Sequence, residues 1–250
     1  MRCPARAHPS DRTPLRPLRR PVAEIAGRRA QCWAASGTDS ARVSRDARGT
    51  WTFERFDGRT GATRVTTPLR DLPAGSEPCL VATAAGFAVA YRQSPPATAS
   101  GSDFRLRVPA ADGRELADVP AGHTPAYTTP SIAASEAIVF VWWRDDDHRQ
   151  LGFAIFDDPS QPVAATGTID SLGSWLTGAV AQGRALAFFS VSGTTLYTTR
   201  IDASGRQPDG PVWRSVALAF GTDLPPAAPL GADWLVATNP SAPPAGGRWC

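Results

Sequence analysis

The densest group of chemically active side chains lies in the run 144–149, where Asp145, Asp146, Asp147 and His148 are consecutive. Carboxylate oxygens are ligands that Ca²⁺ prefers in proteins. Side chains on consecutive residues diverge unless the backbone folds back, and the run contains no glycine that would allow so sharp a turn. We therefore interpret the run as a solvated turn between the apolar segments 138–143 and 151–156. We predict neither a metal site nor a cofactor.

His123, in the segment 121–127, is the other side chain that could take part in catalysis. Acid–base or nucleophilic catalysis requires a second group within hydrogen-bond distance of the imidazole. The sequence supplies no partner histidine and no nucleophile at a suggestive spacing. It therefore predicts no catalytic residue and favours a binding protein over an enzyme.

The elements that would position these residues recur along the chain. The segments 51–57, 103–109, 151–157 and 196–202 each have the pattern of an apolar strand that ends in a turn. The apolar residue before each turn is Phe56, Val108, Phe156 or Ile201, which gives spacings of 52, 48 and 45 residues. A period in this range predicts a tandem array of structural repeats.

Each of these segments follows two strand-like runs and precedes another. The runs directly before them are 30–34, 87–91, 138–142 and 185–189, and a fifth such run is 234–238. A four-stranded sheet cannot bury both of its faces alone, so each unit must stack on its neighbours. Radial stacking predicts an all-β fold, a β-propeller-like array of four-stranded antiparallel blades, ahead of a pair of β-sandwiches or an open β-solenoid.

We predict units at about 21–72, 78–120, 129–170 and 176–220, with a partial unit at 226–250, or about four and a half repeats of roughly fifty residues. This number predicts a partial or imperfectly closed propeller. Residues 1–20 are rich in Arg and Pro, so we expect a disordered leader whose deletion leaves thermal unfolding unchanged.

Through segments such as 86–91 and 196–202, residues 21–240 resemble the divergent β-propeller repeats of secreted bacterial proteins. Segment 44–51 also resembles the Asp-box of sialidases, Ser-x-Asp-x-Gly-x-Thr-Trp. Ser44, Asp46, Thr50 and Trp51 match this pattern, whereas Gly49 comes one residue late. In that family the box is a structural turn outside the catalytic centre, between the third and fourth strands. Here we expect it between the second and third.

In a propeller, the turn between the second and third strands opens on the same face as the connection between units. The resemblance therefore implies that the loop 145–148 shares one edge with His123, which we place on such a connection. We define the rim as His123, Trp143, Asp145, Asp146, Asp147 and His148, and we predict that it binds a ligand. One of the adjacent Trp142 and Trp143 should point inward and the other outward, and core packing between blades is expected of at least one.

Two functional hypotheses follow. The first is a non-enzymatic propeller that binds a protein or a glycan through one face, either as a binding module or as a scaffold. The alternative is a propeller glycoside hydrolase or lyase similar to sialidases, which requires two acids about 5–10 Å apart in the central funnel. The resemblance also implies an extracellular or cell-envelope location, although residues 1–20 contain no recognisable signal peptide.

The charge distribution argues against a nucleic-acid partner. Residues 1–48 contain 11 Arg and 4 acidic residues, whereas the remaining residues contain 15 Arg and 19 acidic residues. The body of the protein is therefore mildly acidic, unlike a surface that binds phosphates. No apolar stretch approaches the length of a membrane span.

The four cysteines are Cys3, Cys32, Cys79 and Cys250, and no Cys-x-x-Cys spacing points to zinc. Cys32 and Cys79 fall in neighbouring predicted units, but their number alone does not establish a disulfide.

The strongest structural expectation concerns the residues before the hairpin turns. Phe56, Val108, Phe156 and Ile201 should all be buried between sheets at equivalent positions. Phe53 and Phe153, three residues earlier than Phe56 and Phe156, should lie on the opposite face of their strands, so that both faces are covered.

Overall fold

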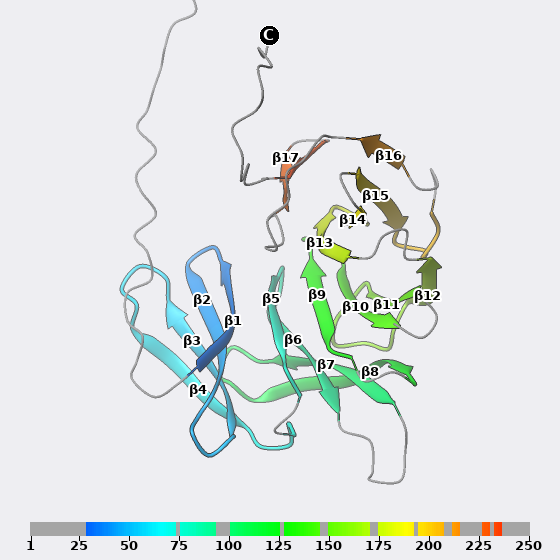
Figure 1. The fold of residues 1–250 in the computed structure, drawn as a ribbon. Coiled ribbons are helices and arrows are strands. Elements are labelled where there is room, and N and C mark those ends of the chain that lie inside the picture. The colour runs from blue at the N-terminus through cyan, green and yellow to red at the C-terminus, as the bar shows by residue number, and fades with distance from the viewer. Residues whose placement is uncertain are drawn as a thin grey trace, which may run out of the picture.

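Every regular element in the described part of the chain is a β-strand. The computed structural model describes residues 29–73, 76–93, 101–125, 128–145, 150–170, 175–192, 195–207, 212–215, 227–230 and 233–236. The strands form four antiparallel four-stranded sheets, blades 1 to 4, and one two-stranded sheet (Figure 1).

The strands follow one another in chain order within each sheet. Blade 1 contains β1 (Arg29–Ser36), β2 (Asp39–Arg45), β3 (Trp51–Asp57) and β4 (Thr63–Leu69). Blade 2 contains β5 (Cys79–Thr83), β6 (Gly86–Gln93), β7 (Ser102–Pro109) and β8 (Glu115–Thr124). Blade 3 contains β9 (Pro130–Ala134), β10 (Val139–Asp145), β11 (Gln150–Phe156) and β12 (Ala165–Asp170). Blade 4 contains β13 (Trp175–Gln182), β14 (Ala185–Ser192), β15 (Thr195–Asp202) and β16 (Val212–Ser215), and β17 (Ala227–Leu230) pairs with β18 (Asp233–Val236).

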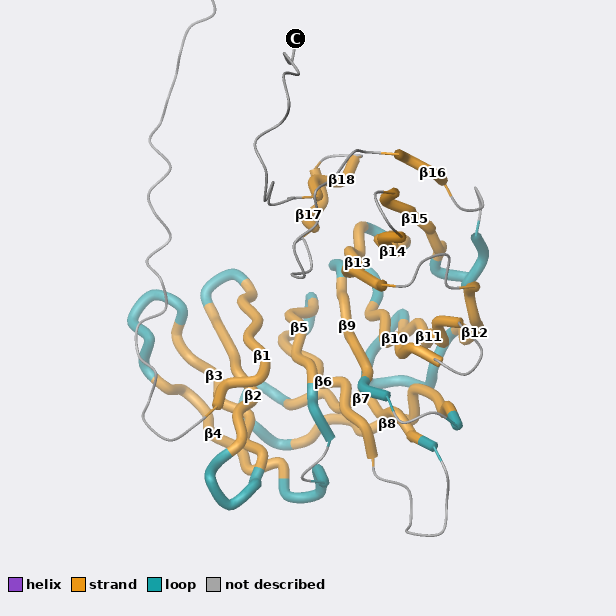
Figure 2. The backbone as a smooth tube through the Cα atoms, viewed as in Figure 1, coloured by secondary structure: helices purple, strands orange, loops and turns teal. Residues whose placement is uncertain are grey.

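The first strands of successive sheets lie side by side around a common centre. Strand β1 contacts β5, β5 contacts β9, β9 contacts β13 and β13 contacts β17. Figures 1 and 2 show these strands on the inside, with β4, β8, β12 and β16 toward the outside. This radial arrangement confirms the predicted all-β, β-propeller-like array of four-stranded blades.

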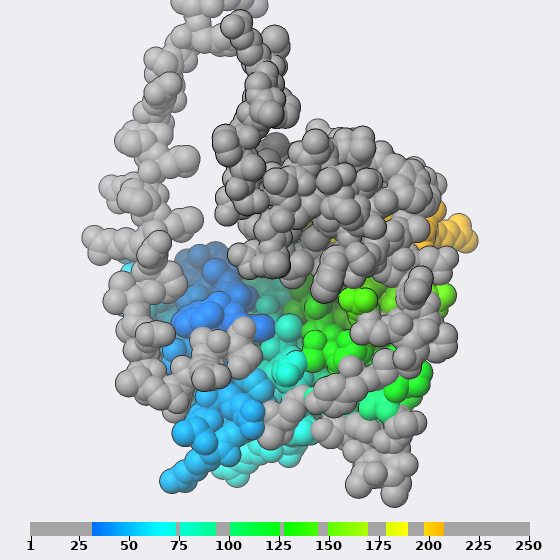
Figure 3. Space-filling model, in the orientation of Figure 1, coloured from blue at the N-terminus to red at the C-terminus, as the bar shows by residue number. Residues whose placement is uncertain are grey.

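Apolar cores fill the three spaces between the four blades. Phe53 of blade 1 meets Phe87 of blade 2, with ring centroids 6.2 Å apart. Trp142 of blade 3 meets Phe188 of blade 4 edge to face at 5.6 Å. Trp143 enters the core between blades 2 and 3, because adjacent residues of a strand point to opposite faces. Both tryptophans are therefore in cores. In the view of Figure 3, coloured atoms of blades 1 to 3 follow one another from blue through cyan to green.

The residues before the hairpin turns are buried as predicted, but Phe56 lies on the face of blade 1 that points away from blade 2 and not between two described blades. Phe56, Val108, Phe156 and Ile201 expose 8, 4, 0 and 0% of their surface. Phe156 packs against blade 2, whereas Phe153, three residues earlier, packs against blade 4. Both faces of the third blade are therefore covered.

The predicted equivalence of Val108 to the other three residues is wrong. Val108 follows Leu106 by two residues on β7 and so shares the face that packs on blade 3. Phe156 and Ile201 instead face the preceding blade. Segment 103–109 is the loosest of the four sequence repeats, and aligning it by the last apolar residue before the turn puts Val108 one position out of step with the other three.

The predicted strand order of the first unit is also wrong. Run 30–34 belongs to β1, the first strand, and the second strand is Asp39–Arg45, which the sequence pattern did not predict. Strand β2 has only Ala41 and Val43 on its apolar face. Its opposite face carries Arg42 and Ser44, which are buried although they are polar.

The segment that resembles an Asp-box forms the turn between β2 and β3, at the place expected. Asp46 Oδ1 accepts hydrogen bonds from the backbone nitrogens of Arg48 at 2.9 Å and Thr50 at 2.8 Å. Gly49 has a φ of 88°, which favours glycine. Asp202 closes the β15 turn in the same way, so a local side-chain hydrogen bond sets both turns.

The predicted leader, residues 1–20, lies outside the described residues. The predicted unit boundaries and the predicted incomplete closure of the ring stay predictions.

Within the described ranges, no helix has the length and hydrophobicity needed to cross a membrane.

Phe156→Ala should lower the free energy of unfolding by about 3–5 kcal/mol, because it leaves a cavity in the core between blades 2 and 3. Leu116→Ala is the control, since Leu116 is 63% exposed and its loss should change stability by less than about 0.5 kcal/mol. Urea unfolding of both variants measures the difference. Similar small losses in the two variants would contradict the stacked blades.

Candidate functional site

His123 lies within β8 rather than on the connection where the sequence placed it. It is the cross-strand neighbour of Asp103 on β7, and the imidazole Nδ1 lies 2.7 Å from Asp103 Oδ1. The two side chains are 55% and 46% exposed. Strand β8 extends past the predicted end because it follows β7 through a register shift between Phe104 and Arg105. The imidazole is therefore oriented by a carboxylate and open to solvent.

Trp143 is 7% exposed, so its indole does not present a free face on the rim. The ring stacks on Phe104, with centroids 4.8 Å apart, and lies against two glycines. A Cβ on Gly122 would fall 2.1 Å from Trp143 Cη2, and one on Gly152 would fall 2.3 Å from its Nε1. Trp143 therefore packs against the end of β8 beside His123.

Of the remaining rim residues, only Asp145 is among the described residues. Asp145 ends β10 and pairs with Gln150 across the hairpin, whereas Asp146, Asp147 and His148 lie outside the described residues. Ligand binding by the rim therefore stays a prediction. Among the described residues, no group of three or more His, Cys, Asp or Glu side chains is arranged to hold a metal ion.

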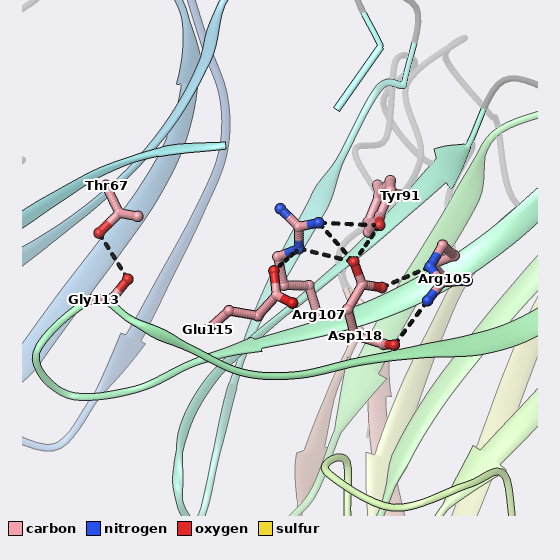
Figure 4. Close-up of polar contacts among 7 residues, drawn as sticks. All are labelled: Thr67, Tyr91, Arg105, Arg107, Gly113, Glu115 and Asp118. Atoms are coloured by element: carbon pink, nitrogen blue, oxygen red, sulfur yellow. Dashed lines mark hydrogen bonds and ion pairs between the residues drawn. The ribbon is translucent and has the colours of Figure 1, made fainter. Parts of the chain in front are cut away.

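A polar network that the sequence pattern did not reveal joins three strands of blade 2 (Figure 4). Asp118 on β8 is its centre and accepts hydrogen bonds from Tyr91 Oη at 2.6 Å, Arg105 Nε at 2.7 Å and Arg107 Nη2 at 2.6 Å. Arg107 also pairs with Glu115 at 3.1 Å. One sequence feature could have indicated this network. Arg105 and Arg107 alternate with apolar residues on β7, which places both arginines on one face of the strand.

The electrostatics of this network indicate a closed structural unit. Burial disfavours the Asp118 carboxylate, but hydrogen bonds from Tyr91, Arg107 and Arg105 outweigh burial and lower the pKa of Asp118. Burial and the hydrogen bond to Asp118 raise the pKa of Tyr91. The Asp118 side chain, 13% exposed, has both oxygens engaged by neighbours. The network therefore ties β6, β7 and β8 together.

A second polar cluster lies on the face of blade 1 that points away from blade 2. The row Trp33, Arg42, Glu54 and Thr66 runs across β1 to β4 as successive cross-strand neighbours. Arg42 Nε donates to Glu54 Oε2 at 2.6 Å, and Ser44 Oγ donates to the same oxygen at 3.3 Å. We call Trp33, Arg42, Ser44, Glu54 and Phe56 the Arg42 cluster.

Two aromatic rings surround the Arg42 guanidinium. Its Cζ lies 5.5 Å from the centre of the Trp33 ring and 5.2 Å from that of Phe56. The two rings stack with centroids 5.7 Å apart. Arg42 is 4% exposed, whereas Trp33 is 46% exposed, so the cluster reaches the surface at the indole.

Arg42 Nη2 is a buried donor with no hydrogen-bond partner among the described residues. A buried guanidinium nitrogen without an acceptor carries a desolvation penalty of roughly 1–3 kcal/mol or more. A hydroxyl or carbonyl oxygen that displaced the groups covering this nitrogen would remove that penalty. The arrangement therefore has the parts of a small polar binding site: an exposed ring, an unused donor and a carboxylate.

The sequence alone did not reveal the Arg42 cluster because the strand that carries Arg42 was not predicted. With Asp39–Arg45 assigned to a loop, Trp33, Arg42 and Glu54 have no common face. The alternation of Arg42 and Ser44 with Ala41 and Val43 was the only signal.

No family model and no curated protein matches the sequence. The structure is similar to that of an Aleuria aurantia lectin variant in complex with alpha-methyl-L-fucoside, with a TM-score of 0.50, 15% identity, and coverage of 88% of this chain and 79% of the lectin. It also matches the β-propeller domain of the trilobed protease from Pyrococcus furiosus, with a TM-score of 0.42, 12% identity, and coverage of 68% and 51%. Kuenenia stuttgartiensis hydrazine synthase matches with a TM-score of 0.46, 12% identity, and coverage of 78% and 56%.

The chain thus spans about half the length of the hydrazine synthase and protease chains that it matches. At these identities the similarity concerns the fold and transfers no residue or activity. The likeness to the lectin and the blade geometry agree that the protein has a β-propeller fold.

Asp118→Asn should destabilise the protein by about 1–3 kcal/mol at pH 7, since hydrogen bonds to a charged group are lost. The pKa of Asp118 is lowered by folding, so its contribution is complete above the unfolded value of about 3.9 and is lost as the pH falls through the folded value. The difference between the variant and the wild type should therefore shrink below about pH 4.

Urea unfolding at a series of pH values measures this difference. Asp112→Asn is the control, because Asp112 is 54% exposed and pairs with Arg114 at the surface. A difference between Asp118→Asn and wild type that persists unchanged into acid would contradict the assigned network.

Proposed function

We propose that this protein is a non-enzymatic β-propeller binding module that recognises a carbohydrate, and that the Arg42 cluster is its binding site. The observation that carries the proposal is the unpartnered Arg42 Nη2 beside the exposed ring of Trp33. The donor and the ring lie on adjacent strands of one sheet, so the site is held by β-strands rather than by loops.

The charge of the site favours a neutral polyhydroxylated ligand. Arg42 and Glu54 contact each other at 2.6 Å, so their charges compensate and give no net attraction for an ion. Sugar hydroxyls can accept from the guanidinium and donate to the carboxylate, while the apolar face of a pyranose can pack on the exposed part of Trp33. A phosphorylated or strongly acidic ligand would compete with Glu54.

The similarity to the lectin is consistent with this function at the level of the fold. That protein is in complex with alpha-methyl-L-fucoside. A propeller of similar architecture thus accommodates a sugar, whereas the residues proposed here rest on the geometry of this chain alone.

The alternative of a glycoside hydrolase receives less support. Such enzymes need a carboxylic acid whose pKa is raised so that it can protonate the leaving group. Among the described carboxyl groups, each of those with a shifted pKa has it lowered: Asp57, Asp112, Asp118, Asp158 and Asp202. Neighbouring hydrogen bonds therefore favour the charged forms of these carboxyl groups. A charged carboxylate can accept hydrogen bonds, but it has no proton to give to a leaving group as a general acid must.

The test is a glycan array followed by titration of the sugars that bind. Trp33→Ala and Glu54→Gln should each weaken binding at least about tenfold, through lost stacking and a weakened acceptor. Leu116→Ala and Glu115→Gln are matched controls, since they remove an exposed apolar side chain and a carboxylate outside the cluster.

Circular dichroism and thermal unfolding establish that each variant is folded. Absence of binding by the wild type to any printed glycan overturns the proposal, as does full affinity in both cluster variants. Release of reducing sugar from a bound glycan would favour the hydrolase, and capture of a protein ligand in place of a glycan would favour a protein-binding module.

A further inference from the structure

Two free thiols lie where the first two blades meet near the centre of the propeller. Cys32 is on β1 and Cys79 is on β5, the inner strands of blades 1 and 2, and these strands contact each other. Both cysteines are half-buried and neither is in a disulfide. Cys32 packs at the margin of the core between the two blades.

The two thiols make equivalent contacts with the next blade. Cys32 Sγ donates to the carbonyl oxygen of Pro78 at 3.2 Å, and Pro78 directly precedes Cys79. Cys79 Sγ donates in turn to the carbonyl oxygen of Pro130 at 3.4 Å, at the start of β9. The same position therefore carries a cysteine on two successive inner strands, and the first thiol reaches the backbone beside the second.

We propose that Cys32 and Cys79 form a reversible disulfide that links blades 1 and 2 across their inner strands. The bond would be installed by exchange with a small-molecule disulfide. Nothing in this inference depends on the proposed carbohydrate site, because neither sulfur belongs to the Arg42 cluster.

The two thiols differ in reactivity, and this difference determines which of them attacks the small disulfide first. Hydrogen bonding with the Cys79 thiol lowers the pKa of Cys32 below its usual range, more than burial raises it. The same hydrogen bond, together with burial and the nearby Glu77, raises the pKa of Cys79. A thiolate is the nucleophile in thiol–disulfide exchange, so Cys32 attacks first.

In the first step, the Cys32 thiolate attacks one sulfur of the small disulfide, which forms a mixed disulfide on Cys32 and releases one thiolate. Cys79 then loses its proton to solvent and attacks the Cys32 sulfur, which expels the second small thiolate. Both released thiolates take up protons. Overall, two protein thiols are oxidised to one disulfide and one small disulfide is reduced to two thiols.

The bond would close a loop that runs from Cys32 to Cys79 and contains β2, β3 and β4 of blade 1. Cross-linking a loop of this length restricts the unfolded chain, and we expect the midpoint of thermal unfolding to rise by roughly 5–15 °C. The disulfide would thus fasten blade 1 to the rest of the propeller.

The test uses the full chain with Cys3→Ser and Cys250→Ser, so that only the two inner-strand thiols remain. Incubation with oxidised glutathione should produce a single species that has lost two hydrogens, and peptide mapping should join the peptides that contain Cys32 and Cys79. Dithiothreitol should restore both thiols and reverse the rise in melting midpoint.

Single replacements test the assigned order of the two thiols. Cys79→Ala should stop at the mixed disulfide on Cys32, and the pH at which Cys32 alkylation is half-maximal should move upward, because the side chain that hydrogen-bonds with Cys32 is gone. Stable glutathione adducts on both cysteines of the parent, or oxidised dimers in place of the internal bond, would overturn the proposal. An unchanged alkylation profile in Cys79→Ala would do the same.

Discussion

The need to cover both faces of every sheet governs this structure. A blade of four strands presents two surfaces, and its central strands carry apolar side chains on both, as Phe153 and Phe156 do on β11. Apolar surfaces of this kind are buried when another blade lies against them. The stacking of the blades therefore supplies most of the apolar burial, and it fixes where the polar groups of each sheet can lie.

Blade 1 departs from this pattern on the face that points away from blade 2. That face carries Arg42 and Glu54 where blade 3 has small and apolar side chains such as Val141 and Ala154. The comparison with the Asp118 network is informative. Both are buried Arg–carboxylate groups, but the Asp118 oxygens are fully engaged, whereas Arg42 keeps an unpartnered nitrogen beside an exposed ring. The Asp118 network therefore holds the strands of blade 2 together, whereas the Arg42 cluster has a donor that a ligand could use.

The inner strands bring together residues that are far apart in sequence but equivalent in register. Cys32 and Cys79 meet in this way, and each thiol reaches a backbone carbonyl at or just before the start of the next inner strand. Repetition of one structural unit around a centre thus creates pairs of like residues without any local motif. On the outer side, Thr67 Oγ1 donates to the carbonyl of Gly113 at 3.0 Å and ties blade 1 to blade 2 again.

The sequence by itself determined the class of fold, because alternation along a strand and the Asp and Gly of the turns are local properties. The predicted runs 87–91 and 185–189 lie within strands β6 (Gly86–Gln93) and β14 (Ala185–Ser192). Only the tertiary structure decided the assignment of β2, the face on which Val108 lies and the burial of Trp143. In each case a partner from elsewhere in the chain sets the outcome: Glu54 for Arg42, the packing of β7 on blade 3 for Val108, and Gly122 for Trp143. Such contacts depend on cross-strand register and on the stacking of blades, which no local pattern specifies.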